Sequence, residues 1–158
     1  ITLGIVPGIG AMVVPYRRWP QAAATFHGML RRADKLKAAE ARKLGVVDAL
    51  ADDLPGLIVT ALARVQALAG KPSPIAQGAV PLAPLEPITP ASASGQPLSQ
   101  EIMGILESAV RDAAAATTLD AALEIGYRAF GASACTAAAR EGIGAFQEES
   151  KPDFSSTA

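Results

Sequence analysis

The stretch LGIVPGIG at residues 3–10 is apolar and carries three glycines within eight residues. Glycine has no Cβ, so the backbone at such positions can approach another segment closely. Pro7 fixes φ and has no N–H, which suits the start of a helix. We therefore expect an apolar turn leading into a short buried helix over residues 9–14, closed by Pro15. A glycine spacing of this kind is by itself weak evidence for a ligand site.

Apolar residues recur at helical spacing through most of the chain, and Asp53 and Ser99 stand where N-caps are expected. Half of the residues are hydrophobic, so the chain can bury a substantial core. A run of small apolar residues after Gly45 favours one short buried strand near residues 46–50. The expected fold class is therefore mainly α with a short β edge. The predicted helices lie near residues 20–32, 38–44, 54–69, 100–116, 118–131 and 136–148.

Residues 71–98 differ in composition from the rest of the chain, because seven prolines recur there among Ala, Ser and Gly. Proline excludes a helix and disfavours a central strand. We expect an extended arm whose apolar residues lie on a surface. A recognition peptide for a proline-binding module is the alternative. The arm then separates two predicted regions, residues 1–70 and residues 99–158.

The composition of the chain excludes several classes of function but does not identify one. A net charge of −1 argues against nucleic-acid binding driven by bulk charge. The single cysteine, Cys135, suits a reducing compartment such as the cytoplasm, and we expect it packed inside the protein. No apolar run approaches the roughly 20 residues of a membrane helix. The sequence has no metal-ligand motif, so we expect no metal site.

Two sets of polar residues on the predicted helix at 20–32 and just after it allow alternative interpretations. His27, the only histidine, is either a general base or an ordinary half-buried side chain, and the absence of a partner motif favours the second. Arg31, Arg32, Lys35 and Lys37 are either a rim for phosphates or a solvated helix end. We favour the solvated helix end, where cations complement the helix dipole.

Four ordered stretches resemble the enoyl-CoA hydratase/isomerase (crotonase) superfamily. They are LGxxPGxG at 3–10, AxEAxxxGVVD at 38–48, the helix at 57–68, and EGIxAF at 141–146, which KPDF follows at 151–154. The resemblance implies the C-terminal half of a crotonase-like α/β fold, a superhelix of ββα units. On this basis residues 1–70 end the core, and residues 99–158 form a helical region for oligomerisation.

The resemblance also implies the chemistry. The family acts on coenzyme A thioesters through an enolate held in an oxyanion hole. Its two acid/base carboxylates would lie upstream of Ile1, so we expect no catalytic residue in this chain and no activity from the chain alone. Pro7 and Gly8 match substrate-binding positions, and Phe146 and Lys151 match positions that bind coenzyme A. No cofactor is expected beyond the coenzyme A of the substrate.

Three departures and one alternative qualify this resemblance. Glu149 and Ser150 stand where the family has a Lys-Arg pair, Ala11 replaces a usual glycine, and Arg31 falls near where the family often has a glycine after its helix. The expected partners are the acyl-CoA, the upstream half and two or more copies of the chain, since family members form trimers or hexamers. We expect residues 118–148, including Ala139 and Ile143, at that contact. The alternative function is a non-catalytic helical module of the same descent that assembles or binds a partner.

Overall fold

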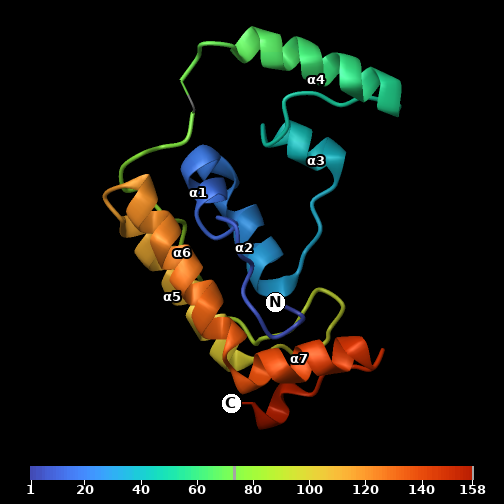
Figure 1. The fold of residues 1–158 in the computed structure, drawn as a ribbon, viewed down its shortest axis with the longest axis vertical. Coiled ribbons are helices and arrows are strands. Elements are labelled where there is room, and N and C mark those ends of the chain that lie inside the picture. The colour runs from blue at the N-terminus through green and yellow to red at the C-terminus, as the bar shows by residue number, and fades with distance from the viewer. Residues whose placement is uncertain (73, 158) are drawn as a thin grey trace.

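The computed structural model describes residues 1–72 and 74–157, and this part of the chain is mainly helical (Figure 1). Two short 3₁₀ turns, Pro20–Ala22 and Phe154–Ser156, complete the regular structure. Each of the six predicted helices is present, with ends within a few residues of those expected. The helices are α1 (Val14–Arg18), α2 (Ala23–Arg32), α3 (Ala38–Lys43), α4 (Leu54–Leu68), α5 (Gln100–Ala115), α6 (Leu119–Ala134) and α7 (Ala137–Gln147).

The core lies where α5 packs against α6 on one side and against the α1–α2 segment on the other (Figure 1). Ile102, Leu106 and Val110 recur every four residues along α5 and are almost fully buried. This spacing places them on one face of the helix. Tyr16 and Phe26 pack into the same cluster from α1 and α2. The predicted cap Ser99 begins α5 by accepting the amide of Ile102.

The predicted strand at residues 46–50 is wrong. Gly45 adopts a left-handed φ of 70° directly after α3. The amide of Val46 then donates to the carbonyl of Ala41 at 2.8 Å, and the amide of Gly45 donates to the carbonyl of Arg42 at 3.2 Å. These two bonds are the Schellman arrangement that closes a helix. Val46 is therefore used in a helix end, and the residues after it form a bend.

The short helix predicted over residues 9–14 is also misplaced. Residues 8–13 form successive turns, and α1 begins at Val14 with Pro15 in its first turn. Proline suits a first helical turn because the missing N–H would have no intrahelical acceptor there. Pro15 thus starts the helix that we expected it to end.

The proline-rich arm lies extended across the body, as its composition predicts. Val80, Leu82 and Leu85 are partly buried against the core, and the Val80 amide bonds the carbonyl of Ala114 at 2.9 Å. Near residue 98 the arm pairs briefly with itself. In the described residues a single antiparallel bridge, between Ala91 and Pro97, is the only pairing of strand type.

Arg17 fastens the start of the arm to the end of α5. Its side chain is 2% exposed. One terminal nitrogen donates to the carbonyls of residues 76–78, and the other donates to those of Ala113 and Ala116 at 2.8 and 2.9 Å. The carbonyls at the end of α5 have no further amide partners within the helix, so a buried guanidinium is a suitable donor for them.

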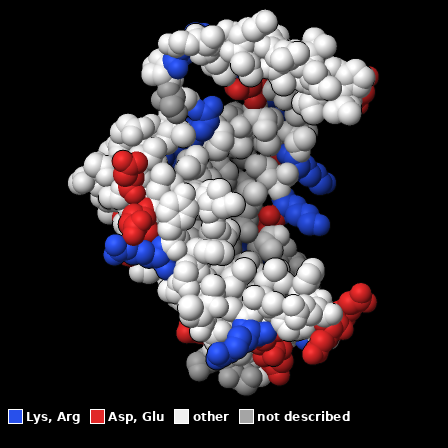
Figure 2. Space-filling model, in the orientation of Figure 1, with Lys and Arg blue, Asp and Glu red and all other residues white. Residues whose placement is uncertain are grey.

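Helix α4 stands apart from this body, at the top of Figure 1, and presents a mostly uncharged surface in Figure 2. The apolar face predicted for it is present, but none of its residues is buried. An ion pair joins its Arg64 to Asp48 at 3.0 Å. No helix in the described ranges combines the length and hydropathy needed to cross a bilayer. On α4 the exposed large apolar side chains are Leu54, Leu57, Ile58, Val59, Leu62, Val65 and Leu68.

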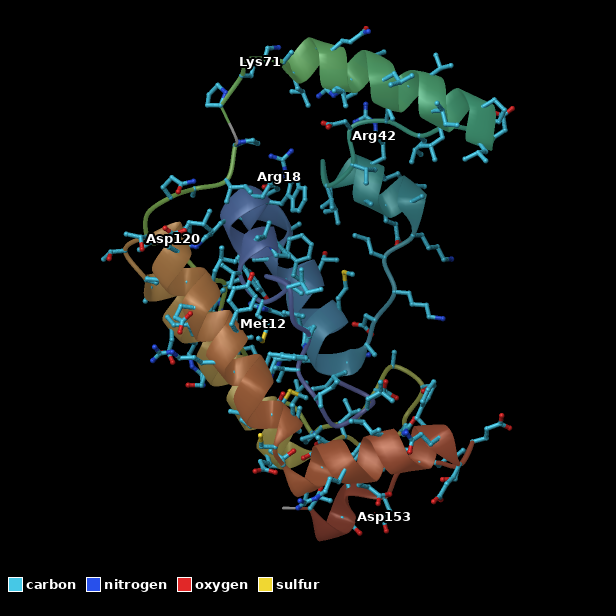
Figure 3. The ribbon with its side chains drawn as sticks, viewed as in Figure 1. Met12, Arg18, Arg42, Lys71, Asp120 and Asp153 are labelled. Carbon is cyan, nitrogen blue, oxygen red and sulfur yellow. The ribbon has the colours of Figure 1, made fainter. Side chains whose placement is uncertain are left out.

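The hydrogen bonds of Arg17 predict different effects for substitutions of two adjacent arginines. Arg17→Met should lower the free energy of unfolding by about 2–4 kcal/mol, because several buried carbonyls lose a charged donor. Arg18→Met should have a much smaller effect, because Arg18 is only half-buried and contacts the Trp19 ring (Figure 3). Urea unfolding of both variants measures the difference. Equal losses would show that the Arg17 bonds do not hold the arm.

Candidate functional site

The glycine-rich stretch lies in direct backbone contact with α7 and against side chains of α6. The Cα of Gly4, at a left-handed φ of 66°, faces the carbonyl of Ala138, and the Cα of Gly142 faces the carbonyl of Leu3. A Cβ added at either glycine would collide with the backbone of the other segment. The two segments can therefore approach this closely only because both positions lack a side chain.

Residues 8–11 form a tight turn of unusual conformation. The Ala11 amide bonds the Gly8 carbonyl at 3.2 Å, and the two central residues have left-handed φ values, 54° at Ile9 and 75° at Gly10. This is the pattern of a type I′ turn. Glycine suits it, whereas a β-branched residue with positive φ is strained. Ile9 is nevertheless 95% exposed. Within the described residues, the amides of residues 8–10 have no protein acceptor.

The predicted substrate residues Pro7 and Gly8 lie against α6. The Cβ position of Gly8 is 3.3–3.5 Å from the ring of Phe130, which backs the turn. Just before it, the Val6 amide donates to the hydroxyl of Ser133 at 3.2 Å. The sequence did not single out Phe130 or Ser133 as site residues. The only available signal was that Phe130 falls in the last turn of the helix predicted at 118–131, whereas Ser133 lies just beyond its predicted end.

Phe146 and Lys151, the residues predicted to bind coenzyme A, both lie on the surface. Phe146 is 70% exposed near the end of α7. Lys151 lines a shallow hollow of about 420 Å³ together with residues 94–97 and Pro152. Among the described residues no hydrogen bond joins this pair to Pro7 or Gly8. The hollow at Lys151 is not lined by Pro7, Gly8 or Phe146.

The run EGIxAF acts structurally at two points. Glu141 accepts the Asp153 amide at 2.7 Å and so fixes the segment after α7 (Figure 3). Glu149 takes a left-handed φ of 53° after the last turn. The Ser150 amide then bonds the carbonyl of Ala145 at 2.8 Å, a Schellman closure of α7. Glu149, which departs from the family pattern, therefore stands at a helix end.

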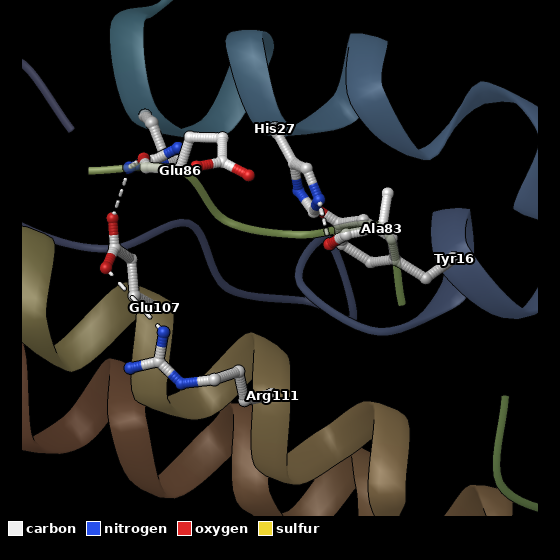
Figure 4. Close-up of polar contacts among 7 residues, drawn as sticks. Tyr16, His27, Ala83, Glu86, Glu107 and Arg111 are labelled. Atoms are coloured by element: carbon white, nitrogen blue, oxygen red, sulfur yellow. Dashed lines mark hydrogen bonds and ion pairs between the residues drawn. The ribbon is translucent and has the colours of Figure 1, made fainter. Parts of the chain in front are cut away.

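His27 is buried and bonded through both ring nitrogens (Figure 4). Its Nε2 lies 2.9 Å from the carbonyl oxygen of Ala83, which can only accept, so Nε2 carries the proton. In the neutral ring, Nδ1 then accepts from the Tyr16 hydroxyl, also at 2.9 Å. Burial raises the pKa of Tyr16, and the nearby Arg31 lowers it to a smaller extent. This arrangement fits a histidine that fastens the arm better than it fits a general base.

Arg31 is buried, which corrects the expectation that its basic run is a solvated helix end. It pairs with Glu107 of α5 at 2.7 Å and donates to the carbonyl of Glu86 at 2.6 Å. Glu107 also pairs with Arg111 of the same helix at 3.7 Å, as Figure 4 shows. Arg32 and Lys35 remain exposed, as expected. Arg31 lies four residues after His27, so helical spacing places it on the buried face and could have revealed it.

Cys135 and Ala139 also differ from expectation. Cys135 follows the last residue of α6 and is exposed, although we expected it packed. Ala139 is 1% exposed inside the body of this chain, so it is not available for a contact between copies. Ile143, its expected partner in that contact, is 42% exposed.

A hollow of about 680 Å³ between α2 and α3 is not lined by any of the predicted site residues. Gly28, Lys35, Glu40 and Lys43 are among its lining residues. Both acidic and basic side chains line it, so its charge does not select one ligand class. Across residues 1–72 and 74–157, no three potential metal-ligating side chains lie close enough together to hold an ion.

Comparison with known proteins identifies no relative: no protein-family model, curated protein or solved structure matches the chain.

The close approach between residues 3–4 and α7 predicts opposite effects for two glycines on one helix. Gly142→Ala should destabilise the fold by about 1–3 kcal/mol, because the new Cβ overlaps the Leu3 carbonyl. Gly144→Ala should be neutral or stabilise by up to about 1 kcal/mol, because Gly144 has nothing within 4 Å. Urea denaturation of both variants tests this, and a Gly142→Ala protein as stable as wild type would contradict the contact.

Tyr16 predicts a loss of stability at alkaline pH. Its pKa is raised in the fold, while an unfolded tyrosine ionises near pH 10. The unfolded state therefore loses its proton first, and stability falls as pH rises above 10. Tyr16→Phe should be weaker by about 1 kcal/mol at pH 8, where the bond to His27 is lost, but less sensitive to pH above 10.

The control for this pH dependence is Tyr127→Phe, because the Tyr127 side chain is 52% exposed. That variant should keep the wild-type slope of unfolding free energy between pH 9 and pH 11. If Tyr16→Phe shows the same slope as wild type over this range, the hydroxyl of Tyr16 is not held neutral by its surroundings.

Proposed function

We propose that the chain is the C-terminal part of an acyl-CoA hydratase or isomerase of the crotonase superfamily. In this proposal its helices complete a crotonase-like α/β fold whose ββα superhelix lies upstream. The substrate is a coenzyme A thioester, and the reaction passes through an enolate held in an oxyanion hole. The two acid/base carboxylates belong to the upstream part. We place the protein in fatty acid metabolism in the cytoplasm.

One observation carries the proposal: two of the family-like motifs contact each other. Leu3 and Gly4, from the first motif, lie against Ala138 and Gly142, from α7 and its EGIxAF run. The glycines of both motifs are needed for that approach. If the two motifs matched the family only by chance, nothing would require them to contact each other in the fold. Their partnership gives the resemblance a physical basis that residue identity alone lacks.

The proposed role of Gly8 is to offer its amide beside the catalytic water. Its N–H has no acceptor among the described residues, so it is free to donate to a ligand. During hydration, the water oxygen bonds the β-carbon of the enoyl thioester while one upstream carboxylate takes a water proton. The other group, present as the carboxylic acid, gives its proton to the α-carbon and becomes a carboxylate. Amides of the oxyanion hole stabilise the negative charge on the thioester oxygen meanwhile.

In this proposal coenzyme A binds along the exposed end of α7. The Phe146 ring, 70% exposed, offers a flat apolar surface to the adenine. Glu149 replaces one of the usual cations, so Lys151 is the cation we assign to a coenzyme A phosphate. Lys151 is exposed and has no acidic partner among the described residues.

Turnover of crotonyl-CoA tests the reaction. We expect the full-length protein to hydrate it and the isolated chain to be inactive. In the full-length protein, Gly8→Pro should lower kcat by roughly 10²-fold, in the range for loss of one preorganised donor. Gly8→Ala keeps the N–H and should lose much less. A full-length protein that neither binds nor converts crotonyl-CoA would contradict the proposal, as would an active isolated chain free of contaminants.

A helical module for assembly is the second candidate, and exposed apolar side chains favour it. Tyr127, Phe130, Ile143 and Phe146 on α6 and α7 are 39–70% exposed. Exposed apolar patches of this kind commonly mark protein interfaces. This candidate is compatible with the first, because an enzyme of the family would use the same helices to form a trimer or hexamer.

Light scattering on the full-length protein tests the assembly. We expect a trimer or hexamer, and Tyr127→Glu combined with Ile143→Glu should shift it toward monomer, because each change places a charge against apolar partners. Ala139→Glu is the control: its side chain is buried within one chain, so it should unfold the protein instead. A monomeric wild type, or a trimer that the double variant leaves intact, would contradict this interface.

A further inference from the structure

Ser133 is the most deeply buried polar side chain near the glycine-rich stretch. It is 0% exposed in the last turn of α6. Its hydroxyl donates to the carbonyl of Phe130 at 2.8 Å and accepts the amide of Val6 at 3.2 Å. Both functions of the hydroxyl are therefore used, one within the helix and one toward the segment that carries Gly8.

Few rotatable backbone angles separate the Val6 amide, which Ser133 fixes, from Gly8. Pro7 lies between them, and its ring fixes one of the intervening angles. Val6 is itself fully buried, so its peptide cannot move without disturbing the core. Pro7 has no N–H, which makes the Val6 amide the last hydrogen-bond donor before Gly8. Fixing this amide thus restricts the direction of the Gly8 N–H.

A second contact from the same turn of α6 restrains Gly8. The Phe130 ring lies 3.3–3.5 Å from the Cβ position of Gly8, and the Phe130 carbonyl is the acceptor for Ser133. One helical turn therefore holds the stretch from two sides. The strained φ of 54° at Ile9 follows immediately, and such a conformation persists only where the surroundings determine it.

We infer that Ser133 is a positioning residue for the proposed active site: it anchors Val6 and, through Pro7, aims the Gly8 amide. The inference rests on the proposed function for the use of that amide. Ser133 does not contact substrate in this scheme. Its hydroxyl acts on the backbone that does.

The test compares Ser133→Ala with Ser99→Ala in the full-length protein. Ser99 is a matched control, since it is 1% exposed and its hydroxyl also accepts a backbone amide, that of Ile102. Both variants lose the bond from a buried backbone amide, and Ser133→Ala also loses the bond within α6 to the Phe130 carbonyl. Only Ser133→Ala touches the glycine-rich stretch. Ser133→Thr keeps the hydroxyl and serves as the conservative rescue.

The first readout is hydrogen exchange of peptides covering residues 5–12. Ser133→Ala should speed exchange of the Val6 amide by at least about 10-fold, while Ser99→Ala leaves it unchanged and Ser133→Thr restores protection. Unchanged exchange in Ser133→Ala would overturn the inference. If Ser133→Ala fails to fold, Ser133→Cys replaces it, since a thiol is a weaker acceptor and should give a partial loss of protection.

The second readout is turnover of crotonyl-CoA. Ser133→Ala should lower kcat about 10-fold per folded active site with little change in KM, since the thioester still binds but the amide is misdirected. A loss equal to that of Ser99→Ala would mean that Ser133 acts only on stability, and would overturn the positioning role. If wild type converts no crotonyl-CoA while exchange still shows the anchor, the proposed function fails and the anchor alone stands.

Discussion

The contact of residues 3–6 with the backbone of α7 and with Ser133 at the end of α6 is the constraint on which the arrangement depends. It joins the start of the described chain to its last long helices, across more than a hundred residues of sequence. Gly4 and Gly142 allow the approach, and the Val6 amide bonded to Ser133 fixes its register. The turn at residues 8–11 is placed by this contact, so any chemistry at Gly8 depends on it.

A second set of bonds holds the proline-rich arm, and it uses side chains that carry charge or titrate. Arg17, His27 and Arg31 each donate to a main-chain carbonyl of the arm. Prolines keep the arm extended and remove some of its amides, but they leave every carbonyl available. Donors from α1 and α2 therefore suit this partner. His27 and Arg31 were the candidates for catalysis and for phosphate binding, and in the structure both bind the main chain of the arm.

The helices were predictable because periodic apolar residues and N-caps act locally. Asp53 and Ser99 begin helices by bonding an amide three residues later, which sequence spacing states directly. The prediction of a strand at 46–50 was wrong because a strand needs a neighbouring strand to pair with. Gly45 instead takes a left-handed conformation, and the Val46 amide closes the end of α3. The burial of Arg31 and the exposure of α4 depend on which distant segments meet, and one sequence does not specify that.

The candidate site was predicted in part. The glycine-rich stretch proved to be closely packed, as its composition indicated, but the residues that hold it, Ser133 and Phe130, lie in a helix with no motif around them. Phe146 and Lys151 share no hydrogen bond with Gly8 among the described residues. Which distant residues come together at a site depends on the packing of the helices, and the motifs of one sequence do not specify that packing.

The most direct test of the central claim is nuclear Overhauser spectroscopy on the protein with labelled glycine and alanine. The contact predicts strong cross-peaks between the Gly4 Hα protons and the protons of Ala138 and Ala139, whose backbone atoms lie beside Gly4. Their loss in Gly142→Val, where a side chain would separate the segments, would support the account further. Absence of these cross-peaks in a folded wild-type protein would contradict it.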